Sequence, residues 1–286
     1  MLRVTAIVPT CTRPLLLERA LRSIAAQELA PSEIIVVDDA GTRSDDNIFR
    51  VLQRCGLRAV HVVANSRAKG ASGARNTGAA LATGDLLAFL DDDDEWLPSY
   101  LAEAVHAFTS REIDVLCADL LCQFDDGVDR AGKTAPGRLL PEIFLIRNPG
   151  LGGSNLILRR ALYRKAGGFD ESLPTCNDRD FGIRLSLCEG VKYERLPKRL
   201  VRFYQHMGPK LCTVKGDAMR AGIRRFYEIH SHRMTEAQRE EFRTNVRFFW
   251  GIDERGEILD DDPATIFEPL LPVLKARLDE KRRQMR

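Results

Sequence analysis

The sequence contains a run of four aspartates directly after a short apolar segment. Leu86 to Leu90 is apolar, and Asp91 to Asp94 follow it without a spacer. Carboxylates gathered this closely are unfavourable unless a cation, hydrogen-bond donors or water compensate them. Oxygen ligands are those that Mg²⁺ and Mn²⁺ prefer. The run therefore indicates a hard-cation site, and a solvated acidic turn after a strand is the alternative.

Two other apolar segments also end in residues that can bind a ligand. Residues 2–8 lead into Pro9 and Thr10, and residues 33–37 lead into Asp38 and Asp39. In an open parallel sheet, ligands bind outside the carboxyl ends of the strands. If all three segments are parallel strands, their polar ends meet at one edge of the sheet.

The segments that must position these residues alternate between strand and helix patterns. We expect strands over 2–8, 33–37, 57–63, 86–90 and 113–118, and helices over 14–26, 48–55, 73–82 and 100–108. Short strands spaced by helices are typical of an α/β protein with a mostly parallel sheet flanked by helices. The pattern is irregular from 123 to 151, and the chain after 205 is helical and charged.

Composition excludes several classes of protein. The chain has 286 residues, and 43 Lys and Arg nearly balance 41 Asp and Glu, which argues against a nucleic-acid partner. No apolar run approaches the ~20 residues that span a bilayer. Seven cysteines without a Cys-x-x-Cys pair favour reduced thiols, so we expect a cytoplasmic protein.

Five motifs in order resemble those of family 2 glycosyltransferases. The acidic run within Phe89 to Pro98 resembles the family's Asp-x-Asp segment. The other four are the opening strand and turn (7–14), a Val-Asp-Asp segment (36–39), an Ala-Arg-Asn-x-Gly segment (74–78), and a Gly-Phe-Asp-Glu segment (168–171) followed by Asn177-Asp178-Arg179-Asp180. Cys11-Thr12 and Asn177 depart from the usual residues, which are Tyr/Phe-Asn and Glu.

This resemblance implies a GT-A fold, a nucleotide-sugar-binding α/β architecture, plus a helical C-terminal segment. The implied catalytic domain covers 1–207, with a nucleotide-binding half (1–120) and an acceptor-binding half (121–207). The implied helical extension covers 208–286.

The resemblance also implies the reaction and the residues that perform it. A sugar would pass with inversion from a nucleotide diphosphate donor, such as a UDP-sugar, to an acceptor hydroxyl, and Asp178 would be the catalytic base. A divalent cation, Mn²⁺ or Mg²⁺, would be held by Asp91, Asp93 and His206. The nucleotide-sugar contacts expected are Pro9, Thr10, Arg13, Asp38, Asp39, Arg75, Asp91 and Asp92. Ser154 and Asn177 are expected to face the acceptor.

The acceptor is expected to be a glycan or a lipid-linked sugar of a bacterial surface polysaccharide or glycolipid. Residues 266–286 form a basic amphipathic segment that fits three roles: peripheral contact with the inner face of the cell membrane, packing on its own domain, or formation of a homo-oligomer. A non-catalytic nucleotide-sugar-binding or assembly subunit with the same fold is the alternative function, because Asn177 lacks the charge of the usual Glu.

Overall fold

A single β-sheet runs through the protein, and its first half is parallel. The computed structural model describes residues 2–41, 46–57, 60–124, 126–205 and 216–259. Strands β1 (Val4–Thr10), β2 (Glu33–Asp38), β3 (Val60–Ala64) and β4 (Leu86–Phe89) lie in the order β3-β2-β1-β4, and neighbouring strands are parallel. β1, β4 and all but the first residue of β2 are buried, as expected for parallel strands covered on both faces.

The second half of the sheet is mixed. β8 (Leu156–Arg159) is antiparallel to both β4 and β6 (Val115–Phe124), and β6 is parallel to β9 (Tyr193–Gln205). β5 (Glu95–Trp96) pairs with β9, and β7 (Asp129–Ala131) pairs with β6. The parallel strand arrangement predicted from the sequence is therefore found in β1 to β4, and the sheet beyond them contains antiparallel pairs.

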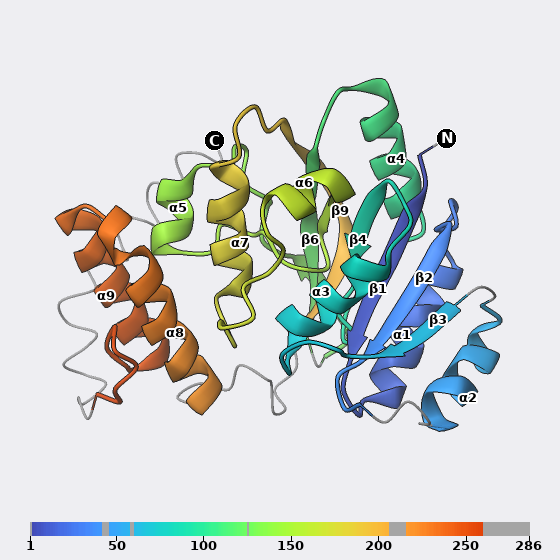
Figure 1. Cartoon of the computed structure of the whole chain (residues 1–286), viewed down its shortest axis with the longest axis horizontal. Helices are drawn as coiled ribbons and strands as arrows, with labels where there is room; N and C mark the ends of the chain where they lie inside the picture. The colour runs from blue at the N-terminus through green and yellow to red at the C-terminus, as the bar shows by residue number, and fades with distance from the viewer. Residues whose placement is uncertain (1, 42–45, 58–59, 125, 206–215, 260–286) are drawn as a thin grey trace.

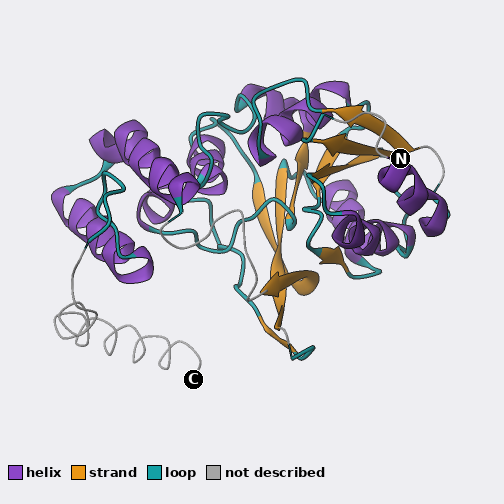
Figure 2. Cartoon of the chain, turned by 90° about the horizontal axis from the view of Figure 1, so that it is seen from below, coloured by secondary structure: helices purple, strands orange, loops and turns teal. Residues whose placement is uncertain are grey.

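Helices cover both faces of the sheet (Figures 1 and 2). Alternate residues of β1 point to opposite faces, so Ile7 joins one hydrophobic cluster while Ala6 and Val8 join the other. The Ile7 cluster includes side chains of α3 (Ala71–Leu81), α5 (Pro141–Ile146), α6 (Arg160–Lys165) and α7 (Asn177–Ser186). The second cluster includes side chains of α1 (Pro14–Ala25), α2 (Asp46–Cys55) and α4 (Tyr100–Ser110).

The C-terminal helices share the Ile7 cluster. α8 (Asp217–His230), a 3-10 turn (Ser231–Arg233) and α9 (Glu236–Trp250) lie at the end of the molecule away from β1 to β3 (Figure 1). They contribute apolar side chains that include Ile223, Phe226 and Phe242 to that cluster. α9 begins with a capping box between Thr235 and Gln238 and ends at Gly251 in the left-handed conformation.

Three sequence predictions fall wholly or partly outside the described residues. His206, the predicted boundary between 207 and 208, and the basic segment 266–286 are among them. Among the helices that the structure describes, none is long and apolar enough to cross a membrane.

Candidate active site

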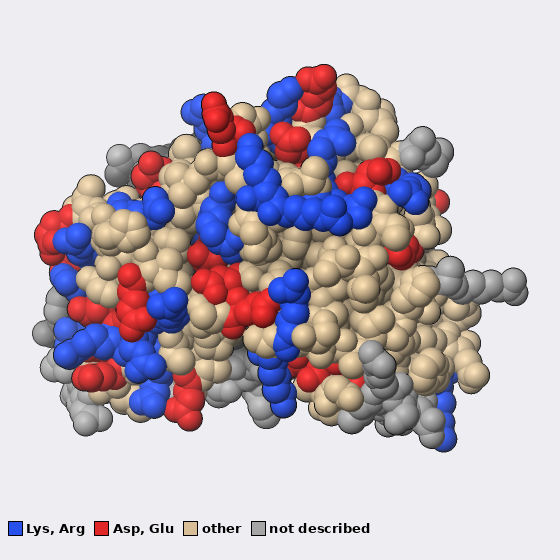
Figure 3. Space-filling view, in the orientation of Figure 1, with Lys and Arg blue, Asp and Glu red and all other residues tan. Residues whose placement is uncertain are grey.

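The polar ends of the parallel strands meet at one edge of the sheet, as predicted. The backbone amide of Asp39 donates to Thr10 O, and that of Leu90 donates to Ile7 O. These bonds place the residues that follow β1, β2 and β4 beside one another. On the face shown in Figure 3, acidic side chains gather in the middle of the molecule, between α3 and the α8–α9 pair, with basic side chains around them.

Three carboxylates of the acidic run converge. One oxygen from each of Asp91, Asp93 and Asp94 lies within 4.8 Å of the other two. Asp94 is only 2% exposed, and burial raises the pKa of its carboxyl well above the usual range. The chain after Asp94 is strand β5, so Asp94 does not cap a helix. Closely spaced carboxylate oxygens fit a hard divalent cation, and this donor set agrees with the predicted one for Asp91 and Asp93.

Asp92 points away from these three and into the protein. It is fully buried and accepts a hydrogen bond of 2.7 Å from Thr10 Oγ1. Arg13 forms an ion pair with Asp92 and a second one of 3.2 Å with Asp93. Burial raises the pKa of Asp92 to about 6, although Arg13 opposes this. The side chains of Asp92 and Thr10 thus bind each other inside the protein, beside the buried Pro9. Contact of these three residues with the nucleotide stays a prediction.

Ser154 also has a different place from the predicted one. Its hydroxyl donates to Asp94 Oδ2 at 2.5 Å and accepts from the backbone amide of Asp91 at 3.0 Å. The residue is 4% exposed, and its carbonyl accepts from the indole of Trp96. Asp91 and Asp94, at the two ends of the acidic run, are therefore both hydrogen-bonded to Ser154. Ser154 therefore supports the carboxylates, and its contact with the acceptor stays a prediction.

Arg75 lies between the acidic run and Asp178. Its guanidinium is buried, with Nη2 2.6 Å from Asp91 Oδ1 and Nη1 4.0 Å from Asp178 Oδ1. Among the residues that the structure describes, no hydrogen-bond partner reaches the buried Nε and Nη1 of Arg75 or Oδ1 of Asp178. Burial raises the pKa of Asp178 to about 6, Arg75 lowers it, and Asp91 raises it further. The arrangement puts one cation between a carboxylate of the acidic run and the predicted base.

The two aspartates at the end of β2, Asp38 and Asp39, differ in their surroundings. Asp38 is buried and accepts from the backbone amide of Ala40. Asp39 is half-buried at the sheet edge, and its carboxylate accepts from Asn65 Nδ2 at 2.7 Å and from the amide of Gly70 at 3.0 Å. Asp39 is therefore held in a fixed orientation where a ligand can reach it, and Asp38 is turned into the protein.

Asn177 begins helix α7, one residue before Asp178. It is half-buried, and its side chain makes no hydrogen bond within the described part of the chain. Cys176 before it adopts a left-handed conformation with φ of 61°.

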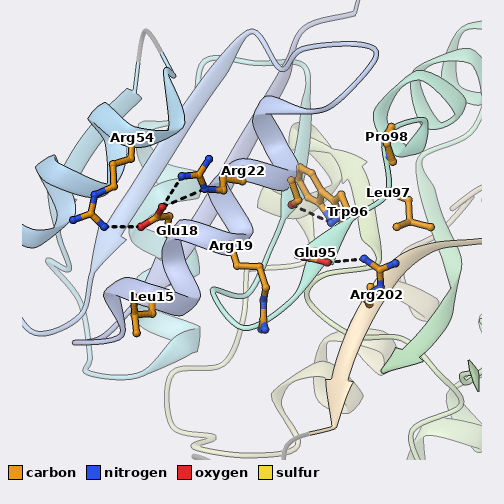
Figure 4. A pocket seen from close by; sticks show the side chains of 11 residues that line it. Leu15, Glu18, Arg19, Arg22, Arg54, Glu95, Trp96, Leu97, Pro98 and Arg202 are labelled. Carbon is orange, nitrogen blue, oxygen red and sulfur yellow. Dashed lines mark hydrogen bonds and ion pairs between the residues drawn. The ribbon is translucent and has the colours of Figure 1, made fainter. Parts of the chain in front are cut away.

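A groove with a volume of about 670 Å³ is lined mainly by residues of α1 and of β5 and the turn after it (Figure 4). Arg19 is one of its lining residues and donates to the carbonyl of Asp93 at 2.7 Å. Its guanidinium also lies 3.5 Å from the centre of the Tyr204 ring. Sequence reasoning missed Arg19 and Tyr204, because neither belongs to a motif and the pairing of β9 with β5 was not predicted.

The fold is that of the GT-A class of glycosyltransferases. The sequence model described as "Glycosyl transferase family 2" matches residues 5–167. The chain belongs to this family and is a glycosyltransferase.

Known proteins agree with this assignment. The chain is 28% identical over 184 residues to UDP-Glc:alpha-D-GlcNAc-diphosphoundecaprenol beta-1,3-glucosyltransferase WfgD of Escherichia coli, over 64% of this chain and 69% of that protein. It is 36% identical over 100 residues to GalNAc(5)-diNAcBac-PP-undecaprenol beta-1,3-glucosyltransferase of Campylobacter jejuni, over 35% of this chain and 32% of that protein. The fold resembles the crystal structure of S. aureus TarS 1-349 in complex with UDP-GlcNAc, with a TM-score of 0.64 at 21% identity, over 87% of this chain and 74% of that one.

Proposed function

We propose that the protein transfers a sugar, with inversion, from a UDP-sugar to a hydroxyl of a lipid-linked or polysaccharide acceptor. The observation that carries this proposal is the position of Arg75 between Asp91 and Asp178, 2.6 Å and 4.0 Å away. Arg75 thus lies between Asp91, which can act at the diphosphate of the donor, and Asp178, which can act on the acceptor. The relatives named above act on diphosphoundecaprenol-linked sugars, which supports an acceptor of that class.

In the proposed reaction, Asp178 takes the proton of the acceptor hydroxyl. The hydroxyl oxygen bonds to the anomeric carbon from the face opposite the diphosphate, the bond from that carbon to the diphosphate oxygen breaks, and UDP leaves. A pKa of about 6 leaves Asp178 mostly ionised at pH 7 and close to the range that suits a general base. One displacement of this kind inverts the anomeric centre.

Asp91, Asp93 and Asp94 would hold Mn²⁺ or Mg²⁺. Such a cation stabilises the negative charge that develops on the leaving diphosphate. Arg13 is the cationic side chain we assign to the diphosphate, because it is 41% exposed and already lies against Asp93. Asp39 is assigned to the N–H of a uracil ring, because its carboxylate is fixed at the sheet edge.

We assign the donor to residues 1–120 and the acceptor to residues 121–207, with Asn177 beside the base. A peripheral contact with the cell membrane fits an acceptor carried on a lipid.

Calorimetry with UDP, and GDP as the control, tests the donor site. UDP is expected to bind with Mn²⁺ and not after chelation, to lose affinity in Asp93→Ala, and to keep it in Asp178→Asn. Turnover is then measured as UDP release from UDP-glucose with an N-acetylglucosaminyl-diphospho-lipid, and Asp178→Asn is expected to abolish it. If neither nucleotide binds when metal is present, the donor assignment fails and a non-catalytic role is favoured.

A further inference from the structure

The residue after the proposed base carries a buried charge. Arg179 is 5% exposed, and burial lowers the pKa of its guanidinium. Nε donates to the carbonyl of Phe144 at 3.0 Å and Nη2 to that of Leu145 at 2.9 Å. In the described part of the chain no carboxylate forms an ion pair with it. Two carbonyls at the end of helix α5 therefore take the place of a counter-ion, since carbonyls at a helix C-terminus attract cations.

The same guanidinium contacts both C-terminal helices. It lies 4.2 Å from the ring centre of Phe226 in α8 and 5.5 Å from that of Phe242 in α9. Both rings are fully buried, and cations attract aromatic faces more strongly where water is absent. Arg179 thus joins α7 to three other helices at one point.

Residues shortly before and after Asp178 also contact α8. Asp180 pairs with Arg184 at 2.6 Å and with His230 Nε2, at the end of α8, at 2.9 Å. At Gly222 in α8, a Cβ atom would lie 2.0 Å from Thr175 Oγ1 and 2.8 Å from the Thr175 amide nitrogen, so α8 touches the backbone before the left-handed Cys176. Asp178, between these anchored residues, lies 4.0 Å from Arg75.

We propose that Arg179 is a positioning residue for sugar transfer: by joining α7 to α5, α8 and α9, it fixes the Asp178 carboxylate against Arg75. This inference rests on the proposed function, in which Asp178 is the base. It also gives the C-terminal helices a role in catalysis, although they and Asp178 lie beyond the residues that match the family. A displacement of about 1 Å in a reacting group can lower a rate about a hundredfold. Loss of the contacts of Arg179 should therefore lower the rate of sugar transfer measurably.

The test compares Arg179→Lys with Val105→Ala. Lysine keeps the charge but cannot donate to two carbonyls while lying flat on a ring. Val105 is buried in the other hydrophobic cluster, so its truncation lowers stability without reaching α7. In Arg179→Lys we expect kcat for UDP release to fall about tenfold or more, with the Kd for UDP within about twofold of the native value. In Val105→Ala both are expected to stay within about twofold.

A second readout does not depend on turnover. Carboxyl-carbon NMR of Asp178, which faces Arg75, Asp91 and Lys133, is expected to show a pKa nearer the ordinary aspartate value in Arg179→Lys, because a displaced carboxylate gains water. If Arg179→Lys does not fold, Phe226→Leu removes the stacked ring and is expected to give the same two changes. An unchanged Asp178 pKa together with native kcat overturns the inference. Full activity in Asp178→Asn would instead overturn the assignment of the base.

Discussion

Replacing Arg75 by glutamine should move the pH dependence of transfer toward higher pH. Arg75 Nη1 lies 4.0 Å from Asp178 Oδ1 and the guanidinium side chain is 4% exposed. At an effective dielectric constant of about 20, a pair at this distance attracts by about 4 kcal/mol, or about three pKa units. Asp178 is 28% exposed, and water weakens this attraction, so we expect a shift of about one to two units.

The direction of the pKa shift depends on which form of Asp178 is stabilised by Arg75. The cation favours ionised Asp178, so its loss raises a pKa that is about 6 in the native protein. The base must be ionised, and the acid limb of kcat should therefore move from near pH 6 to between about pH 7 and pH 8. At pH 7 the ionised fraction would fall from about 90% to about half or less.

The assay is kcat for UDP release between pH 5 and pH 9 at saturating donor, together with carboxyl-carbon NMR of Asp178 in the absence of donor. Arg75→Lys is the matched control, because it keeps a cation and should hold the acid limb within about half a unit of the native position. An acid limb and an NMR pKa that stay near 6 in Arg75→Gln would refute the reasoning, since they would mean that Arg75 has no electrostatic effect on the base.

Three further predictions concern residues that support the site. Ser154→Ala removes the hydroxyl that bonds to both Asp94 and the Asp91 amide. It should lower the free energy of unfolding in urea titrations by about 1–3 kcal/mol and weaken Mn²⁺ binding. An unchanged free energy of unfolding together with unchanged Mn²⁺ affinity would contradict this prediction. Although burial opposes it, hydrogen bonds from His230 and Arg184 lower the pKa of Asp180, so its stabilisation is present above the ordinary aspartate pKa and is lost as pH falls through the lowered one. Asp180→Asn should therefore cost about 3 kcal/mol at pH 7, and the difference from the native protein should shrink in acid; a constant difference would argue against the ion pair. Gly182→Ala places a Cβ 2.4 Å from the Phe144 ring and should cost about 1–3 kcal/mol, whereas Gly137→Ala, with no atom within 4 Å, should change stability by less than about 0.5 kcal/mol.

The parallel half of the sheet could be predicted because its strands are apolar runs that end abruptly in polar residues. β9 could not, because its thirteen residues include Lys198, Arg199 and Pro197, and charge with proline argues against a central strand. Its pairing with β6 and β5 depends on contacts distant in sequence. β7, three exposed residues long, carries no pattern of its own.

The candidate site could also be predicted only in part. Asp39 and Asp91 could be placed at one edge from the sequence, because they follow strands whose ends must meet, whereas Arg75 in α3 was expected there only from the family resemblance. It could not show that Asp92 turns inward to Thr10 while Asp94 turns toward Ser154, since four identical residues in a row carry no information on which way each points. The direction is set by partners that are 60 or more positions away.

The shared hydrophobic cluster has a consequence for how the protein is made. The strands that carry the donor site are synthesised first, but the cluster beside them contains Phe226, Phe242 and Ile252. Domains generally fold as units as the chain emerges, so the face of the sheet that bears α7 lacks part of its covering until residue 252 or so has been translated. Until then Arg179 can bond to the carbonyls of α5, but its contacts with Phe226 and Phe242 are missing. If Arg179 positions the base as proposed, transfer to an acceptor would begin only after the C-terminal helices have folded, and a chain stalled on the ribosome before α9 would be inactive.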